Sequence, residues 1–331
     1  MDKAQKMRET VLERLENMEN GRLDISKIKI KVLPKSPKWR EVIRLDCSYC
    51  KLITLPDLTN IKKLKCNNNK LTALPDLPVV ERLICSGNKL TQMPELPNVT
   101  ILNCTYNRLT VLPDMPKIIN LDCEDNHLIY LPELPIVEYL NCYHNQLTTL
   151  PELPKVKYLI CGSNQLTSLP ELPNIRELNC SYNQLTVLPE LPNIRELYCY
   201  VNKLTVLPKL LNVVHLNCHK NQITCLPNLP NVKNLYCQIN QITVLPELPK
   251  IKYLQCFANP LLYNPKFNRF YWQIINFTTI NTGIRKLRKF NSESVTSKKQ
   301  DLHNELLYSP DLPFYKQTEE YVHWLENTKN K

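Results

Sequence analysis

Thiol side chains recur through this chain at a spacing that could serve either chemistry or packing. Cys50 gives Cys47 the Cys-x-x-Cys spacing of zinc and redox sites, but a zinc site of this kind needs a second pair of ligands. Cys225 stands apart as a lone thiol. The other twelve cysteines follow one another at intervals of 19 residues: Cys47, Cys66, Cys85, Cys104, Cys123, Cys142, Cys161, Cys180, Cys199, Cys218, Cys237 and Cys256. One residue type at one repeat position favours a structural role.

The histidines and glycines do not form a catalytic or metal-binding motif either. His144, His215 and His219 fall at outward strand positions, but a metal site needs more ligands than these. The chain has four glycines and no GxGxxG, P-loop or HExxH motif. The sequence therefore predicts a protein that is not an enzyme, with no catalytic residue, no metal site and no cofactor.

The residues around each cysteine repeat with the same period, which predicts stacked copies of one small unit. The unit reads (I/V)-x-x-L-x-C-x-x-N-x-L-T-x-L-P-x-L-P-x, as in residues 175–193. Alternation along a strand turns Leu178 and Cys180 inward and Asn179 outward. In this copy the inward set is completed by Leu185, Leu188, Leu191 and Ile194. The expected core is a continuous column of leucine and thiol side chains.

Asparagine and proline fix the rest of each coil. An asparagine lies three residues after every cysteine of the series except Cys47, and its amide can pair backbone groups at the turn and in the adjacent coil. Pro189 and Pro192 favour an extended polyproline-like segment over a helix. We therefore expect a gently curved, twisted solenoid with a parallel sheet on its concave face and an extended convex side.

The first eleven positions of the unit resemble the leucine-rich repeat, and this resemblance covers roughly residues 33–265. The remaining eight resemble the LPxLP repeats of bacterial secreted effectors and of leucine-rich proteins from giant amoebal DNA viruses. The resemblance implies a pathogen or virus protein that takes part in host–pathogen interaction. Some such effectors carry a ubiquitin-ligase domain with a catalytic cysteine, but no cysteine follows Cys256 here.

The cysteines also bear on the compartment. Thiols that face the same way in an in-register stack fit disulfide geometry poorly, and buried thiols behave as small hydrophobes. Residues 1–6 are polar and no run of 18 apolar residues occurs, so we expect neither a classical signal peptide nor a membrane span. The expected setting is intracellular and reducing, in a cytoplasm that could be that of a host cell.

Three segments follow along the chain. Residues 1–41 are expected to form a helical cap and a partial repeat, with an amphipathic helix at 3–18 and an edge strand at 27–32. Residues 42–265 hold twelve 19-residue repeats. Residues 266–331 are expected to form a C-terminal cap and helical tail, with an aromatic-rich segment at 267–277, a basic cluster at 284–289 and helices near 300–308 and 314–328.

The net charge of +11 is concentrated at the two ends of the chain. Residues 1–40 carry eleven Lys and Arg against six Asp and Glu, and residues 261–331 carry eleven against seven. The long middle is almost balanced. This distribution disfavours nucleic-acid binding along the repeats, although the basic ends leave it as an alternative.

Aromatic residues gather at the outward strand positions of the later repeats. Such exposed tyrosines are typical of a protein-interaction surface, although tyrosine is also simply a good strand former. The sequence predicts a non-catalytic scaffold that binds a protein of unknown identity on the concave face, with a purely structural role in an assembly as another alternative. The predicted partner-binding residues are Tyr139, Tyr143, His144, Tyr158, Tyr182, Tyr198, Tyr200, His215, His219, Tyr236, Tyr253 and Phe257.

Overall fold

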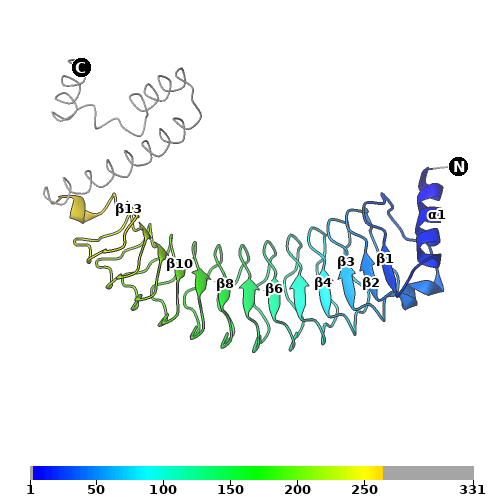
Figure 1. Ribbon diagram of the computed structural model, residues 1–331, viewed down its shortest axis with the longest axis horizontal. Coiled ribbons are helices and arrows are strands. Elements are labelled where there is room, and N and C mark those ends of the chain that lie inside the picture. The colour runs from blue at the N-terminus through cyan, green and yellow to red at the C-terminus, as the bar shows by residue number, and fades with distance from the viewer. Residues whose placement is uncertain (1–2, 264–331) are drawn as a thin grey trace, which may run out of the picture. The chain divides into compact units, whose positions relative to one another are not determined.

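The computed structural model describes residues 3–263, in which thirteen three-residue strands form one parallel sheet in chain order (Figure 1). The chain begins with helix α1 (Lys3–Glu16), and two short 3-10 helices, η1 (Pro37–Glu41) and η2 (Pro260–Tyr263), flank the repeats. The strands are β1 (Arg22–Asp24), β2 (Arg44–Asp46), β3 (Lys63–Lys65), β4 (Arg82–Ile84), β5 (Ile101–Asn103), β6 (Asn120–Asp122), β7 (Tyr139–Asn141), β8 (Tyr158–Ile160), β9 (Glu177–Asn179), β10 (Glu196–Tyr198), β11 (His215–Asn217), β12 (Asn234–Tyr236) and β13 (Tyr253–Gln255).

Every strand pairs with its neighbour at the repeat offset, so the central leucines form one row. Leu197 of β10 lies between Leu178 of β9 and Leu216 of β11, and all three are buried. Between residues 42 and 259 the segments that join the strands contain no helix. The 19-residue unit leaves no room for one, and its prolines disfavour one. The predicted leucine-rich-repeat solenoid is confirmed.

The core consists of the leucine and thiol columns that the spacing predicts. Leu178, Cys180 and Leu185 have 0% of their surface exposed, as do the thiols of nearly every other copy. Burial raises the pKa of the Cys142 and Cys180 thiols to about 12, so both are neutral at physiological pH. The thirteen cysteines from Cys47 to Cys237 form no disulfide; twelve of them are buried, and Cys225, which lies outside the 19-residue series, is exposed. The predicted structural role of the column is therefore confirmed.

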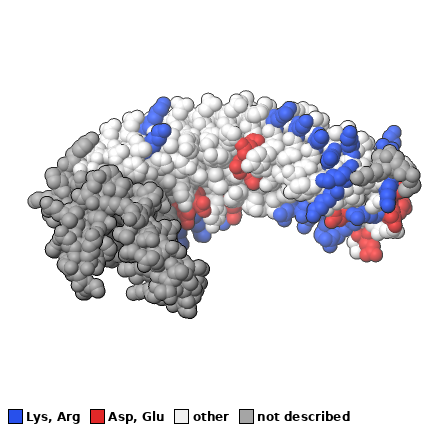
Figure 2. Space-filling model, turned by 90° about the horizontal axis from the view of Figure 1, so that it is seen from above, with Lys and Arg blue, Asp and Glu red and all other residues white. Residues whose placement is uncertain are grey.

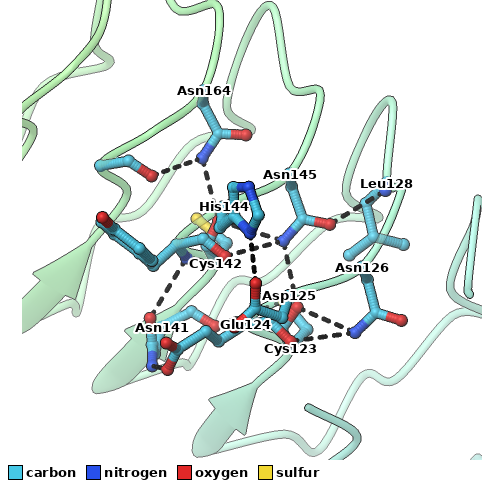
Figure 3. Close-up of polar contacts among 12 residues, drawn as sticks. Cys123, Glu124, Asp125, Asn126, Leu128, Asn141, Cys142, His144, Asn145 and Asn164 are labelled. Carbon is cyan, nitrogen blue, oxygen red and sulfur yellow. Dashed lines mark hydrogen bonds and ion pairs between the residues drawn. The ribbon is translucent and has the colours of Figure 1, made fainter. Parts of the chain in front are cut away.

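The asparagines form a ladder that ties each coil to the one before it (Figure 3). The side-chain amide of Asn145 donates to the carbonyl oxygens of Cys123 and Cys142, at 3.1 and 3.2 Å. Its oxygen accepts from the backbone N–H of Leu128 at 2.9 Å. The Leu128 N–H group depends on Asn145 alone, whereas the carbonyls of Cys123 and Cys142 also accept from Asn126 and Asn164, so neighbouring rungs of the ladder share their acceptors. The same three contacts recur at all eleven copies, from Asn69 to Asn259.

Helix α1 caps the N-terminal end of the sheet. Its apolar stripe buries Val11 and Leu15 completely or nearly so, and the helix packs against β1 and η1. Arg14 donates to the carbonyl oxygen of Asp24 at 2.8 Å. Trp39 of η1 is buried in the same cap. The predicted amphipathic cap helix is confirmed, although it ends at Glu16.

The edge strand predicted at residues 27–32 is wrong. The edge strand is β1, five residues earlier, and it pairs in parallel with β2. Residues 22–26 read Arg-Leu-Asp-Ile-Ser, which repeats the Arg-Leu-Asp-Cys-Ser of residues 44–48 with Ile25 in the thiol position. The alternating lysines that suggested a strand belong to the following turn, where Ile30 is buried as the next core residue.

The predictions for residues 266–331 lie outside the described residues. They comprise the C-terminal cap, the basic cluster and the helical tail. Within the described part of the chain, no helix is both long and apolar enough to cross a bilayer.

Candidate protein-interaction surface

The outward side of the strands, here called the sheet face, presents four columns of side chains. Two columns lie on the strands, three and one residues before each cysteine, and a third follows directly after it. The fourth column, two residues after the cysteine, lies in a left-handed turn: φ is 53° at both His144 and Tyr182 and 55° at Val201. Sequence reasoning placed this fourth column on the strand. The chain must instead turn here to bring the asparagine ladder inward, even where a β-branched residue is strained by it.

Three of the predicted partner-binding residues lie together as one group, here called the aromatic strip: Tyr182, which is exposed, and Tyr200 and His219, which are partly exposed. The rings of Tyr182 and Tyr200 meet edge to face with centroids 5.3 Å apart. Tyr200 and His219 are stacked, with centroids 4.6 Å apart and planes inclined by 10°. These residues come from three consecutive coils; the 19-residue offset aligns Tyr200 with His219, whereas Tyr182 reaches Tyr200 from the next repeat position.

Other predicted residues form smaller groups on the same face. Tyr236 and Tyr253 lie on adjacent strands with ring centroids 5.1 Å apart. Tyr139 and Tyr158 are direct register partners on β7 and β8, and Tyr158 is 40% exposed. Phe257 follows β13 and is 47% exposed. The predicted surface is therefore a series of aromatic groups along the sheet face.

Three of the predicted residues are held by polar neighbours of the same chain. The hydroxyl of Tyr198 donates to Glu196 at 3.0 Å, and burial together with this carboxylate raises the pKa of Tyr198 to about 12. His215 lies 3.0 Å from the side-chain amide of Asn234. His219 contacts the Asn217 side-chain oxygen at 2.7 Å as well as stacking on Tyr200. Tyr198 and His215 are thus less available to a partner than the exposed rings.

A polar network lies next to the aromatic groups, at β6 and β7 (Figure 3). His144 pairs with Asp125 of the preceding coil, and its ring lies 6.3 Å from that of Tyr143 at a tilt. The Asn141 amide donates to Glu124 at 2.9 Å. Sequence reasoning named His144 as a partner contact without recognising Asp125, although the 19-residue offset between the two residues predicts that they are neighbours.

Asp122 in the same network was also missed. One carboxylate oxygen accepts from Asn103 at 3.0 Å, whereas the other is buried without a hydrogen-bond partner. Burial raises the pKa of Asp122 to about 6, with a further contribution from the nearby Glu124 carboxylate. In the column one residue before the cysteine, Asp122 has an asparagine 19 residues away on either side, Asn103 and Asn141. This pattern was the sequence signal for the network.

A hollow of about 510 Å³ borders the sheet face where β8, β9 and β10 begin. Tyr158 lies at this hollow together with both signs of charge, from Arg176, Glu177, Arg195 and Glu196. Its polar lining suits hydrogen bonds and ion pairs with a partner. Within residues 3–263, no group of three or more His, Cys, Asp or Glu side chains could hold a metal ion.

Comparisons with known proteins connect these coils to one fold. No protein-family model matches the chain, and no curated protein matches it. Among solved structures, YopM from Yersinia enterocolitica is 34% identical, with a TM-score of 0.65 over 72% of this chain and 60% of that one. YopM from Yersinia pestis, described as a leucine-rich effector protein, is 29% identical, with a TM-score of 0.57 over 78% of this chain and 89% of that one.

A third similar structure is also described in terms of its cysteines. The functional domain of InlJ from Listeria monocytogenes, described as including a cysteine ladder, is 25% identical, with a TM-score of 0.53 over 70% of this chain and 61% of that one. The chain thus spans about three fifths of the length of InlJ and of the Yersinia enterocolitica YopM. The coils, their register and these likenesses together establish that the protein has the leucine-rich-repeat solenoid fold.

Proposed function

We propose that the protein is a non-catalytic scaffold that binds a protein partner on its sheet face, which we take to be the concave side of the solenoid. The observation that carries this proposal is the aromatic strip, in which Tyr182 is 49% exposed and meets Tyr200 edge to face, and Tyr200 in turn stacks on His219. Tyrosine loses little side-chain entropy on binding because it has only two rotatable bonds, and it combines a large apolar surface with a polar tip.

The size of the surface supports the proposal. A specific interface covers about 800 Å² on each partner. Fully buried aromatic side chains cover roughly 150–250 Å², so a half-exposed ring still offers about 100 Å² to a partner. The twelve predicted residues and the polar hollow beside Tyr158 therefore supply enough area for one standard interface. The contacts among the rings preorganise them, which lowers the entropy cost of binding.

We further propose that the protein is of the LPxLP effector type and acts inside a cell, including a host cell of a pathogen or virus. The Leu-Pro-x-Leu-Pro segments and the likeness to YopM support this proposal. The twelve buried cysteines from Cys47 to Cys237, none of which forms a disulfide, are also typical of a reducing compartment.

The test is affinity capture from a cell lysate with the purified chain, followed by mass spectrometry. The strip variant combines Tyr182→Ala, Tyr200→Ala and His219→Ala, and is expected to lose most of the captured partner because clustered aromatic anchors dominate binding energy.

The matched control combines Tyr49→Ala, Tyr106→Ala and Tyr130→Ala, which removes exposed tyrosines outside the predicted set. This control is expected to capture the partner as the parent does, and both variants should keep the parent's melting temperature. Equal capture by the strip variant and the parent would defeat the proposal.

A further inference from the structure

Four cations form a column on the first strands of the sheet. Arg22, Arg44, Lys63 and Arg82 are direct register partners on β1, β2, β3 and β4, and each is exposed. The spacing between paired strands, about 4.8 Å, sets the distance between their backbones. These strands therefore present one positive charge per coil on the sheet face.

A second column runs along the rim, four residues after the cysteine of each coil. It consists of Lys51, Lys70, Lys89 and Arg108, all exposed. The backbone N–H groups of Lys70 and Lys89 donate to the preceding coil at 2.8 Å, and that of Arg108 does so at 2.9 Å. The rim charges are thus held at the same coil spacing as the strand charges.

The chain itself does not neutralise these eight side chains. None of them has an ion pair or a side-chain hydrogen bond to another residue within the described range 3–263. Like charges on adjacent strands repel each other, so each column costs free energy in the isolated protein. Figure 2 shows Lys and Arg gathered over the N-terminal half of the face, with fewer acidic side chains among them.

We propose that these two columns, here called the basic surface, bind an acidic segment of another polypeptide. Glutamates three or four residues apart on a helix have Cβ atoms about 5–6 Å apart, close to the coil spacing of about 4.8 Å. A row of carboxylates can therefore meet one cation per coil, with bidentate contacts at the arginines. The basic surface lies on β1–β4 and in the turns after β2–β5, and it does not depend on the aromatic strip, which lies in the turns after β9–β11.

The neighbouring residues favour a polypeptide over a nucleic acid. Binding of single-stranded nucleic acid usually uses several aromatic rings for base stacking. Tyr49 and Tyr106 are the exposed tyrosines beside the rim column, and they lie on non-adjacent coils.

The experiment measures the fluorescence anisotropy of a labelled poly-L-glutamate peptide on the purified full chain at low salt. The basic-surface variant combines Arg44→Gln, Lys63→Gln, Lys70→Gln and Lys89→Gln. The matched control removes the same charge from exposed lysines of later coils, through Lys155→Gln, Lys203→Gln, Lys220→Gln and Lys233→Gln. We expect about tenfold weaker binding by the first variant and less than about twofold weakening in the control.

Further arms separate the competing ligands. A variant with Lys70→Arg and Lys89→Arg keeps both positive charges and should bind as the parent does, which shows that substitution at these positions does not itself disturb the fold. The strip variant should also retain polyglutamate binding. Equal losses in the basic-surface and control variants would overturn the proposal. So would tighter binding of an oligothymidylate of the same charge, which would indicate nucleic acid. If the chain dimerises and the same substitutions abolish the dimer, the ligand of the basic surface is a second copy of this chain, and the proposal is overturned as well.

Discussion

The inner and outer sides of each strand follow different rules, although they share one backbone. Inward positions repeat leucine and cysteine in nearly every coil and are buried without exception from β2 to β13. Outward positions change from basic at β2–β4 to acidic at β6 and aromatic in the turns after β9–β11. The difference shows that the fold depends on one set of residues while the recognition surface varies independently on the other.

The largest expected effect is a cavity on the inner side. Leu159→Ala in β8, at a side chain with 0% exposure, should lower the free energy of unfolding by about 3 kcal/mol. The paired control, Val187→Ala at a side chain that is 55% exposed, should change it by less than about 0.5 kcal/mol. Urea denaturation followed by circular dichroism measures both. Similar losses in the two variants would contradict the division between inner and outer sides.

The asparagine ladder gives the next largest effect. Asn145→Ala removes four hydrogen bonds and leaves the Leu128 N–H group buried without a partner, whereas the carbonyls of Cys123 and Cys142 keep Asn126 and Asn164, so we expect a loss of about 2 kcal/mol. Gln146→Ala, at the exposed neighbouring position, is the control. Hydrogen exchange should also show faster opening of the coils beside Asn145. An unchanged exchange pattern would mean that the ladder does not connect the coils.

Asp122 is an outward residue, but one of its carboxylate oxygens is buried like the residues of the inner side. Its folded pKa of about 6 lies above its usual value of 3.8, so the native state binds the proton more tightly than the unfolded state does. Stability should therefore fall as the pH rises from about 4 through 6. Asp122→Asn should be more stable than the parent at pH 7 by about 1 kcal/mol, allowing for solvent screening. This gap should close as the pH falls to 4, as measured by thermal unfolding across that range. A constant gap would show that ionisation of Asp122 does not matter.

The left-handed turns provide a smaller effect of the opposite sign. Val201 has a φ of 55°, which costs a β-branched residue about 1–2 kcal/mol, whereas glycine adopts this conformation freely. Glycine also loses more entropy on folding, so Val201→Gly should gain only about 0.5 kcal/mol. Val206→Gly, at another exposed valine, is expected to lose stability. Equal changes in the two melting temperatures would contradict the turn geometry.

The sequence predicted the inner side better than the outer side, for a physical reason. Leu178, Cys180 and Asn183 each recur every 19 residues, and a constant period leaves few ways to bury such side chains. β1 was missed because Ile25 replaces the cysteine and a three-residue insertion at residues 39–41 breaks the period. The contacts of His144 and Asp122 depend on the side chains of neighbouring coils, and that of Tyr198 depends on Glu196 of its own strand; the repeat pattern alone does not specify these contacts.

The central claim is that the aromatic strip contacts a protein partner while the inner column only holds the coils together. Hydroxyl-radical footprinting of the chain, alone and with its captured partner, tests this claim most directly, because it reports the solvent access of individual tyrosine rings. The partner should protect Tyr182 and Tyr200 from oxidation and leave Tyr130 as reactive as in the free chain. Unchanged oxidation of Tyr182 and Tyr200 in the complex would contradict the account.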